Sequence, residues 1–237
     1  TNQFMDTMDR QINLTDFFIQ NTELKDFFKK IGEINSTFEI EHMLVSKEEG
    51  IKLLKTTKNK IDLINKKGFD FFKKFFITIG ASKTLIDALL TDQELIKYLF
   101  ESNKFDDLIE SYKELKIQSS GLNVIKSLPW LEAWLMSPQT KPDIIEIFIF
   151  SICEEFGEEG KAFAMQLLER GGIIWNALLQ PNHIKISHYF NMLSSRKSFG
   201  NSGIIKAKKL LNDKSVIDEL TSKKVSKQTI EMLKKFY

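Results

Sequence analysis

The chain has little of several residue types, and each shortage excludes a class of structure. Its 237 residues include one cysteine, Cys153, so no disulfide can form within the chain, which suits a reducing compartment. No apolar run reaches the ~18–20 residues that span a bilayer. The first residues lack an apolar signal core and an initiator methionine, which predicts a soluble cytoplasmic module cut from a longer protein. Only four prolines and eleven glycines interrupt the chain, which favours helices.

The chain also lacks an excess of charge of either sign. The chain carries 34 basic and 32 acidic residues, for a formal net charge of +2. A general electrostatic attraction to nucleic acid is therefore not expected. The composition is 42% hydrophobic and 28% charged, which is typical of a chain that folds around a core.

Motifs that carry catalysis are missing as well. The sequence contains no phosphate-binding glycine loop, no nucleophile elbow and no metalloprotease motif. His183 and His188 are five residues apart, whereas metal-binding pairs on a helix favour a spacing of four. His42 stands alone, and Cys153 lies in an apolar helix that predicts an inert, buried thiol. We therefore expect a binding protein with no cofactor and no metal, not an enzyme.

What the sequence does have is helical periodicity. Several segments place apolar residues three and four apart with charges on the opposite face, and no Asn-Gly or Asp-Gly hairpin turns occur. The segment 142–156, PDIIEIFIFSICEEF, is apolar on several faces, which predicts a helix buried nearly all round. Its β-branched content would also permit a strand, but its neighbours are clearly helical. The fold class predicted is all-α.

Three junctions resemble one another and suggest an internal repeat. They are LINKKGFDFFKKFF (63–76), VIKSLPWLEAWLMSP (124–138) and LLERGGIIWNALLQP (167–181). The closing prolines of the second and third, Pro138 and Pro181, are 43 residues apart, within the range of about 40–47 typical of armadillo and HEAT repeats. The first lies further away, which suggests an insertion or an irregular unit. Glycine would let a short helix turn sharply into a long one. An ordinary helix bundle with glycine caps is the alternative.

The repeat pattern divides the chain. Residues 1–46 have short amphipathic helices and capping signals but no such junction, which predicts a small helical subdomain. Residues 47–237 would form an armadillo-like, right-handed superhelical array.

The segments 51–76, IKLLKTTKNKIDLINKKGFDFFKKFF, and 107–137, with the apolar helix 142–156 after them, resemble the N-terminal regulatory region of diaphanous-type formins. In that family a GTPase-binding subdomain precedes an armadillo array. The resemblance implies that Thr57, Lys58, Asn59 and Lys60 contact the switch regions of a GTP-loaded Rho-family GTPase. It also implies that an intramolecular C-terminal segment docks on the array until the GTPase relieves autoinhibition. Actin would be reached only through other domains, and Mg²⁺ and GTP would belong to the partner.

The sequence offers further candidate binding residues, and each of them also has a purely structural explanation. Four residues are assigned to a concave, peptide-binding face: Ile145, Phe148, Ile152 and Asn176. Phe17, Phe18 and Phe28 would add aromatic anchors for the GTPase. Each of these side chains could instead pack a core, and Thr57–Lys60 could be a solvated loop. The segment 66–76 could be a basic membrane-surface helix, although the repeat phasing places its rings inside. A generic armadillo scaffold that binds another peptide or assembly subunit is the alternative function.

Overall fold

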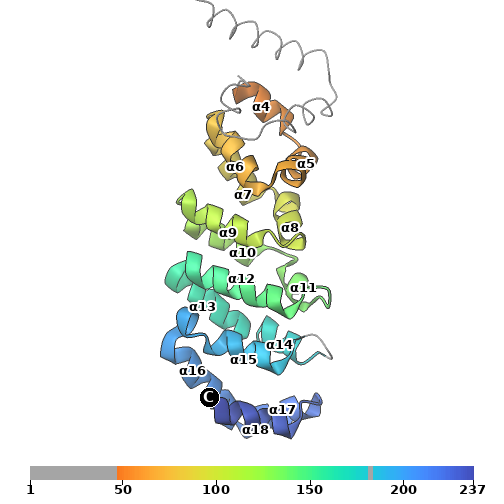
Figure 1. Cartoon of the computed structure of the whole chain (residues 1–237), viewed down its shortest axis with the longest axis vertical. Helices are drawn as coiled ribbons and strands as arrows, with labels where there is room; N and C mark the ends of the chain where they lie inside the picture. The colour runs from red at the N-terminus through yellow and green to blue at the C-terminus, as the bar shows by residue number, and fades with distance from the viewer. Residues whose placement is uncertain (1–46, 181–183) are drawn as a thin grey trace, which may run out of the picture. The chain divides into compact units, whose positions relative to one another are not determined.

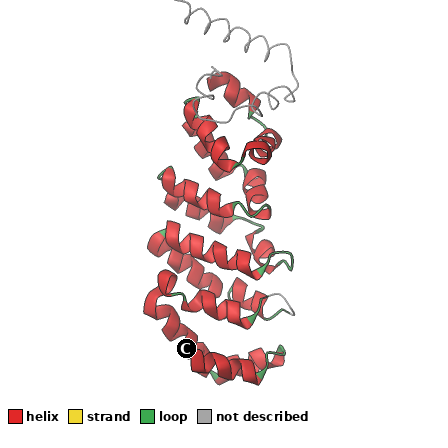
Figure 2. Cartoon of the chain, in the orientation of Figure 1, coloured by secondary structure: helices red, strands yellow, loops and turns green. Residues whose placement is uncertain are grey.

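The computed structural model describes residues 47–180 and 184–237, and every regular element in those ranges is a helix (Figure 2). The predicted all-α class is therefore confirmed. Contacts divide the chain into two compact units, Thr1–Leu108 and Ile109–Tyr237. The predicted subdomain 1–46, with Phe17, Phe18 and Phe28, lies outside the described residues. Within the described ranges, none of the helices combines the length and the apolar character needed to cross a membrane.

The helices of the first unit end with one that continues into the second. They are α4 (Lys47–Leu53), α5 (Thr57–Lys67), α6 (Phe69–Thr78), α7 (Ser82–Thr91), α8 (Gln93–Glu101) and α9 (Phe105–Glu114). The described core of this unit is rich in phenylalanine. Phe69, Phe72, Phe75 and Phe76 of α6 are all 3% exposed or less, and α6 packs against α5 and α7. These four rings lie inside, as the repeat phasing predicted, while Phe71 is half-buried and Ile77 is 51% exposed on the same helix.

The second unit holds the rest of the helices. They are α10 (Gln118–Ser127), α11 (Leu131–Met136), α12 (Pro142–Glu155), α13 (Gly157–Leu168), α14 (Ile173–Leu178), α15 (Ile186–Ser194), α16 (Arg196–Asn212), α17 (Lys214–Ser222) and α18 (Lys227–Phe236). Equivalent helices lie on one another in this unit: α11 contacts α14, and α12 contacts α15 (Figure 1). A short helix followed by two longer ones therefore forms one layer, and the next three helices form another.

Groups of three helices recur along the chain, although the first helix is clearly the short one only at α11 and α14, which have 6 residues each, whereas α5 has 11. The first helix of each group begins at Thr57, Gln93, Leu131, Ile173 and Lys214, at intervals of 36, 38, 42 and 41 residues. The three predicted junctions do not all separate the same pair of helices within a group. The glycine at position 68 separates the first helix of a group from the second, whereas Pro129 and Gly171–Gly172 lie between a third helix and the next first helix. The residues between the first two predicted junctions thus hold complete helices in the same order, not an insertion.

Gly171 and Gly172 make the tight corner between α13 and α14 in two different ways. Gly171 has a φ of +85°, which L-residues rarely adopt. Gly172 has an ordinary φ of −72°, but a Cβ there would lie 2.4 Å from the carbonyl oxygen of Gln166. The predicted sharp turn is confirmed, but its direction is reversed. A helix of 12 residues turns into one of only 6, so 173–178 is the short helix.

The apolar segment 142–156 forms α12, the helix that we predicted, and not a strand. Ile145, Phe148, Ile149 and Ile152 are fully buried, and Trp134 of α11 meets Phe148 edge-on at 5.5 Å between ring centroids. One side of the helix is open, because Ile147 is 44% exposed. Burial is therefore less complete than the sequence predicted.

Candidate functional site

The polar stretch 56–60 is the start of helix α5, not a loop. Thr56 is the N-cap residue, and its hydroxyl accepts a hydrogen bond from the backbone N–H of Asn59 at 3.3 Å. This cap sets the direction of the first helical turn, so residues 57 to 60 point to different sides of the helix. The helical geometry of this turn therefore decides which of its side chains face the protein and which face the solvent.

Two of the four predicted contact residues face inward, toward Asp92. The ammonium of Lys60 lies 2.6 Å from the Asp92 carboxylate, and the hydroxyl of Thr57 donates to the same carboxylate at 2.9 Å. Asp92 is the N-cap of α8 and also accepts from the backbone N–H of Leu95 at 3.1 Å. The side chains of Lys60 and Asp92 are only 9% and 12% exposed. This network joins α5 to α8, so Thr57 and Lys60 stabilise the unit itself.

Electrostatics agree with this structural role. Burial works to raise the pKa of Asp92, but the hydrogen bonds from Lys60, the Leu95 amide and Thr57 outweigh it, and the pKa is lowered below its usual value. The carboxylate is therefore charged at neutral pH and holds both side chains of α5.

Of the other two residues of the turn, Lys58 is the one that faces outward. Lys58 is exposed, and Asn59 is half-buried. A partner that approached α5 here would meet Lys58 first, with Asn59 beside it. The predicted set of four therefore divides into two scaffold residues and two surface residues, a division that spacing alone could not reveal.

The predicted peptide-binding residues of α12 belong to the core. Ile145, Phe148 and Ile152 have no exposed surface, so a peptide on the surface of the second unit does not reach them. This corrects their assignment to a concave face in favour of the core reading. Asn176 is exposed on α14, and its side-chain amide donates to the backbone oxygen of Gly171 at 3.3 Å.

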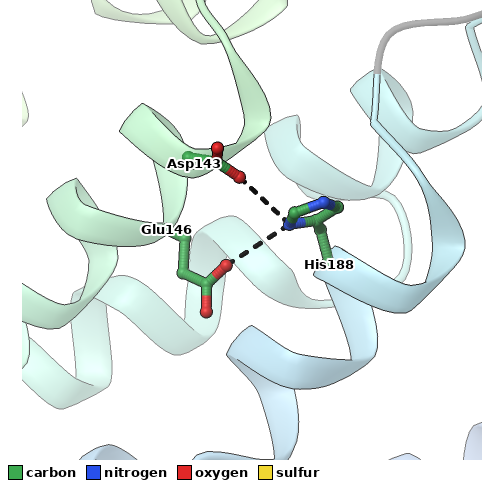
Figure 3. Close-up of side chains that lie close together, drawn as sticks. All are labelled: Asp143, Glu146 and His188. Carbon is green, nitrogen blue, oxygen red and sulfur yellow. Dashed lines mark hydrogen bonds and ion pairs between the residues drawn. The ribbon is translucent and has the colours of Figure 1, made fainter.

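A cluster that the sequence analysis missed joins α12 to α15. Asp143 and Glu146 are one turn apart on α12, and His188 lies in the first turn of α15. The imidazole Nδ1 lies 3.4 Å from Oε2 of Glu146 and 3.6 Å from Oδ1 of Asp143 (Figure 3). The three ligand atoms are all within 4.8 Å of one another. The carboxylates precede the histidine by more than forty residues, so a search for neighbouring ligands in sequence does not find them.

The second unit also has a basic cavity of about 720 Å³. The end of α14, the start of α15 and the turn between α17 and α18 surround it. Lys185, Lys223 and Lys224 line it together with apolar residues and the N-cap Ser226 of α18, and none of the described lining residues is acidic. Such a lining suits a ligand that combines apolar and negatively charged groups.

The described helices define an all-α protein, and those of the second unit lie in successive layers. Comparison of the chain with protein-family models, with curated proteins and with solved structures found no match.

Proposed function

We propose that the chain is a protein-binding module built of armadillo-like units. The observation that carries this proposal is the recurrence of a three-helix group at intervals of 36 to 42 residues, with equivalent helices in contact in the second unit. Repeat stacks of this kind leave extended surfaces on which peptides and proteins dock. The right-handed superhelix of an armadillo array is part of the proposal.

The partner that we propose for the first unit is a GTP-loaded Rho-family GTPase, as the resemblance to formins implies. Lys58 and Asn59 at the start of α5 are its contact residues, because Lys58 is exposed with the half-buried Asn59 beside it, while Asp92 fixes the turn that presents them. A cation and an amide are suited to the acidic side chains and exposed backbone of a partner. In the parent protein, a formin-like actin nucleator associated with the cytoskeleton, GTPase binding would displace an intramolecular C-terminal segment. Such coupling is reciprocal and typically about 1–3 kcal/mol.

The test is a titration of the full chain with Rho, Rac and Cdc42-type GTPases, loaded with either a non-hydrolysable GTP analogue or GDP. We expect binding only in the GTP form. Lys58→Glu should weaken it about tenfold or more, and Asn59→Asp should weaken it in the same direction. Lys83→Glu, at an exposed lysine of α7, is the matched control and should bind like the original chain. Equal binding in both nucleotide states, or none to any GTPase, would contradict this partner.

The second candidate function is a scaffold that binds an acidic peptide, and the basic cavity favours it. Its probe is a labelled amphipathic peptide of glutamate and leucine, compared with a peptide that has lysine in place of glutamate. The acidic peptide should bind, and the double variant Lys223→Glu with Lys224→Glu should weaken it about tenfold or more. Lys208→Glu, an exposed lysine of α16, is the control. Equal binding of both peptides would contradict this function.

A further inference from the structure

We propose that Asp143, Glu146 and His188 form a binding site for one divalent transition-metal ion, with Zn²⁺ the preferred metal. The two carboxylates project from the same side of α12, because residues three apart on a helix are neighbours on its surface. His188 approaches them from α15, with its Nδ1 between the two carboxylates (Figure 3). All three ligands come from helices of the second unit and not from loops, which gives the site a rigid frame.

The distances fit metal ligands better than hydrogen-bond partners. An N–H···O hydrogen bond has a usual length of about 2.9 Å, and a contact at about 3.6 Å is outside that class. Nδ1 lies 3.4 Å from Glu146 and 3.6 Å from Asp143. Zinc ligands at about 2.0–2.2 Å in a tetrahedron are separated from one another by roughly 3.4 Å. Both distances from the imidazole nitrogen are close to that separation, and the three ligand atoms together lie within 4.8 Å of one another.

Charge also favours a cation at this point. Several carboxylates of the second unit have a lysine partner, such as Glu154 with Lys197 at 2.7 Å and Glu155 with Lys113 at 2.8 Å. In the described ranges, no lysine or arginine lies within ion-pair distance of Asp143 or Glu146, and the imidazole is the partner of both. A divalent ion would offset the charge of the two carboxylates.

The donor set selects the kind of metal. One imidazole nitrogen with two carboxylate oxygens suits Zn²⁺ and its neighbours in the transition series, whereas Mg²⁺ and Ca²⁺ favour sites made entirely of oxygen. Three protein ligands leave one position of a tetrahedron for water or for a ligand from another molecule. Because the ligands come from α12 and α15, the bound ion would link equivalent helices of two successive layers.

The test is calorimetric titration of the full chain with ZnCl₂ after dialysis against a chelator. We expect about one equivalent to bind. The variants His188→Ala, Glu146→Gln and Asp143→Asn should each weaken binding about tenfold or more. Asp143 is 77% exposed, so its variant keeps the test open even if the others disturb folding. Glu159→Gln, at an exposed glutamate of α13, is a control of matched residue type and should bind normally.

Further measurements distinguish a specific site from adventitious metal binding. Co²⁺ should bind with the intense visible absorption of tetrahedral coordination, and His188→Ala should abolish that spectrum. MgCl₂ should give no comparable heat. Zinc at a hundredfold excess over its Kd should also raise the Tm, on the order of 5–10 °C. Absence of zinc binding, or binding that the three variants leave unchanged, would overturn the proposal and leave the cluster as an ion pair.

Discussion

At the scale of single residues, Asp92 joins two helices of the first unit, a role that the spacing of residues in the sequence did not indicate. Its carboxylate caps α8 and holds Lys60 and Thr57 of α5. We expect Asp92→Ala to lower the free energy of unfolding of this unit by about 3 kcal/mol, because it leaves a nearly buried ammonium without its partner and removes a helix cap. Urea unfolding followed by circular dichroism measures this. Asp87→Ala, at an exposed position of α7, should stay within about 0.5 kcal/mol of the original chain.

The same carboxylate predicts a dependence on pH. Because its pKa is lowered in the folded protein, its stabilising contribution is fully present above the unfolded value of about 3.9. That contribution is lost as the pH falls through the lower, folded pKa. Asp92→Asn should therefore destabilise the chain at pH 7, and the gap to the original chain should narrow below about pH 4. A gap that stayed constant down to pH 2.5 would show that the charge of Asp92 is not what stabilises the unit.

Cys153 gives a second test at this scale. The thiol is 4% exposed on α12, and burial raises its pKa to about 11. The fraction of reactive thiolate at pH 8 is then roughly a hundredfold below that of a thiol with the ordinary pKa of 9.0. Alkylation by iodoacetamide should be at least that much slower in the native chain than in urea. Comparable rates would mean that α12 opens often enough to expose the thiol.

At the scale of elements, substitutions of the two glycines between α13 and α14 should destabilise the protein for different reasons. Gly172→Ala places a Cβ against three backbone oxygens, which cannot move aside as a side chain would, and should cost about 1–3 kcal/mol. Gly171→Ala meets no atom within 4 Å but must hold a φ of +85°, at about 1 kcal/mol. Asparagine tolerates that conformation, so Gly171→Asn should unfold at a higher urea concentration than Gly171→Ala. Gly172→Asn should bring no such recovery.

Local sequence patterns predicted the helices, but they did not predict which position each helix takes in a group of three. The apolar run of α12 and the glycine corner at 171–172 were recognisable, because periodicity and turn residues act over a few positions. The boundary between α7 and α8 was missed because Asp92 makes it, with a carboxylate cap in place of glycine or proline. The turn at Gly68 was recognised but assigned to the wrong boundary, because a turn residue does not reveal which helix of a group it follows.

The candidate sites depend on which helices of successive groups lie on one another. His188 meets Asp143 and Glu146 only because α15 lies on α12, a pairing between equivalent helices of successive layers. Its spacing from His183 was the wrong quantity to test, since the partners come from the preceding layer. The same reasoning explains Lys60, which the resemblance placed at an interface. Its burial becomes visible only when α8 is known to lie beside α5.

At the scale of the whole molecule, the boundary at Leu108 and Ile109 gives the last prediction. Each unit has its own core, and all three tryptophans, at positions 130, 134 and 175, belong to the second. Circular dichroism reports helices in both units, whereas tryptophan fluorescence reports the second alone. In helical repeat proteins, destabilisation acts mainly on near neighbours. Asp92→Ala should therefore shift the urea midpoint seen by circular dichroism and leave the fluorescence midpoint nearly unchanged, while Gly172→Ala should lower the fluorescence midpoint. If Asp92→Ala shifted both midpoints equally, the two units would unfold as one cooperative body.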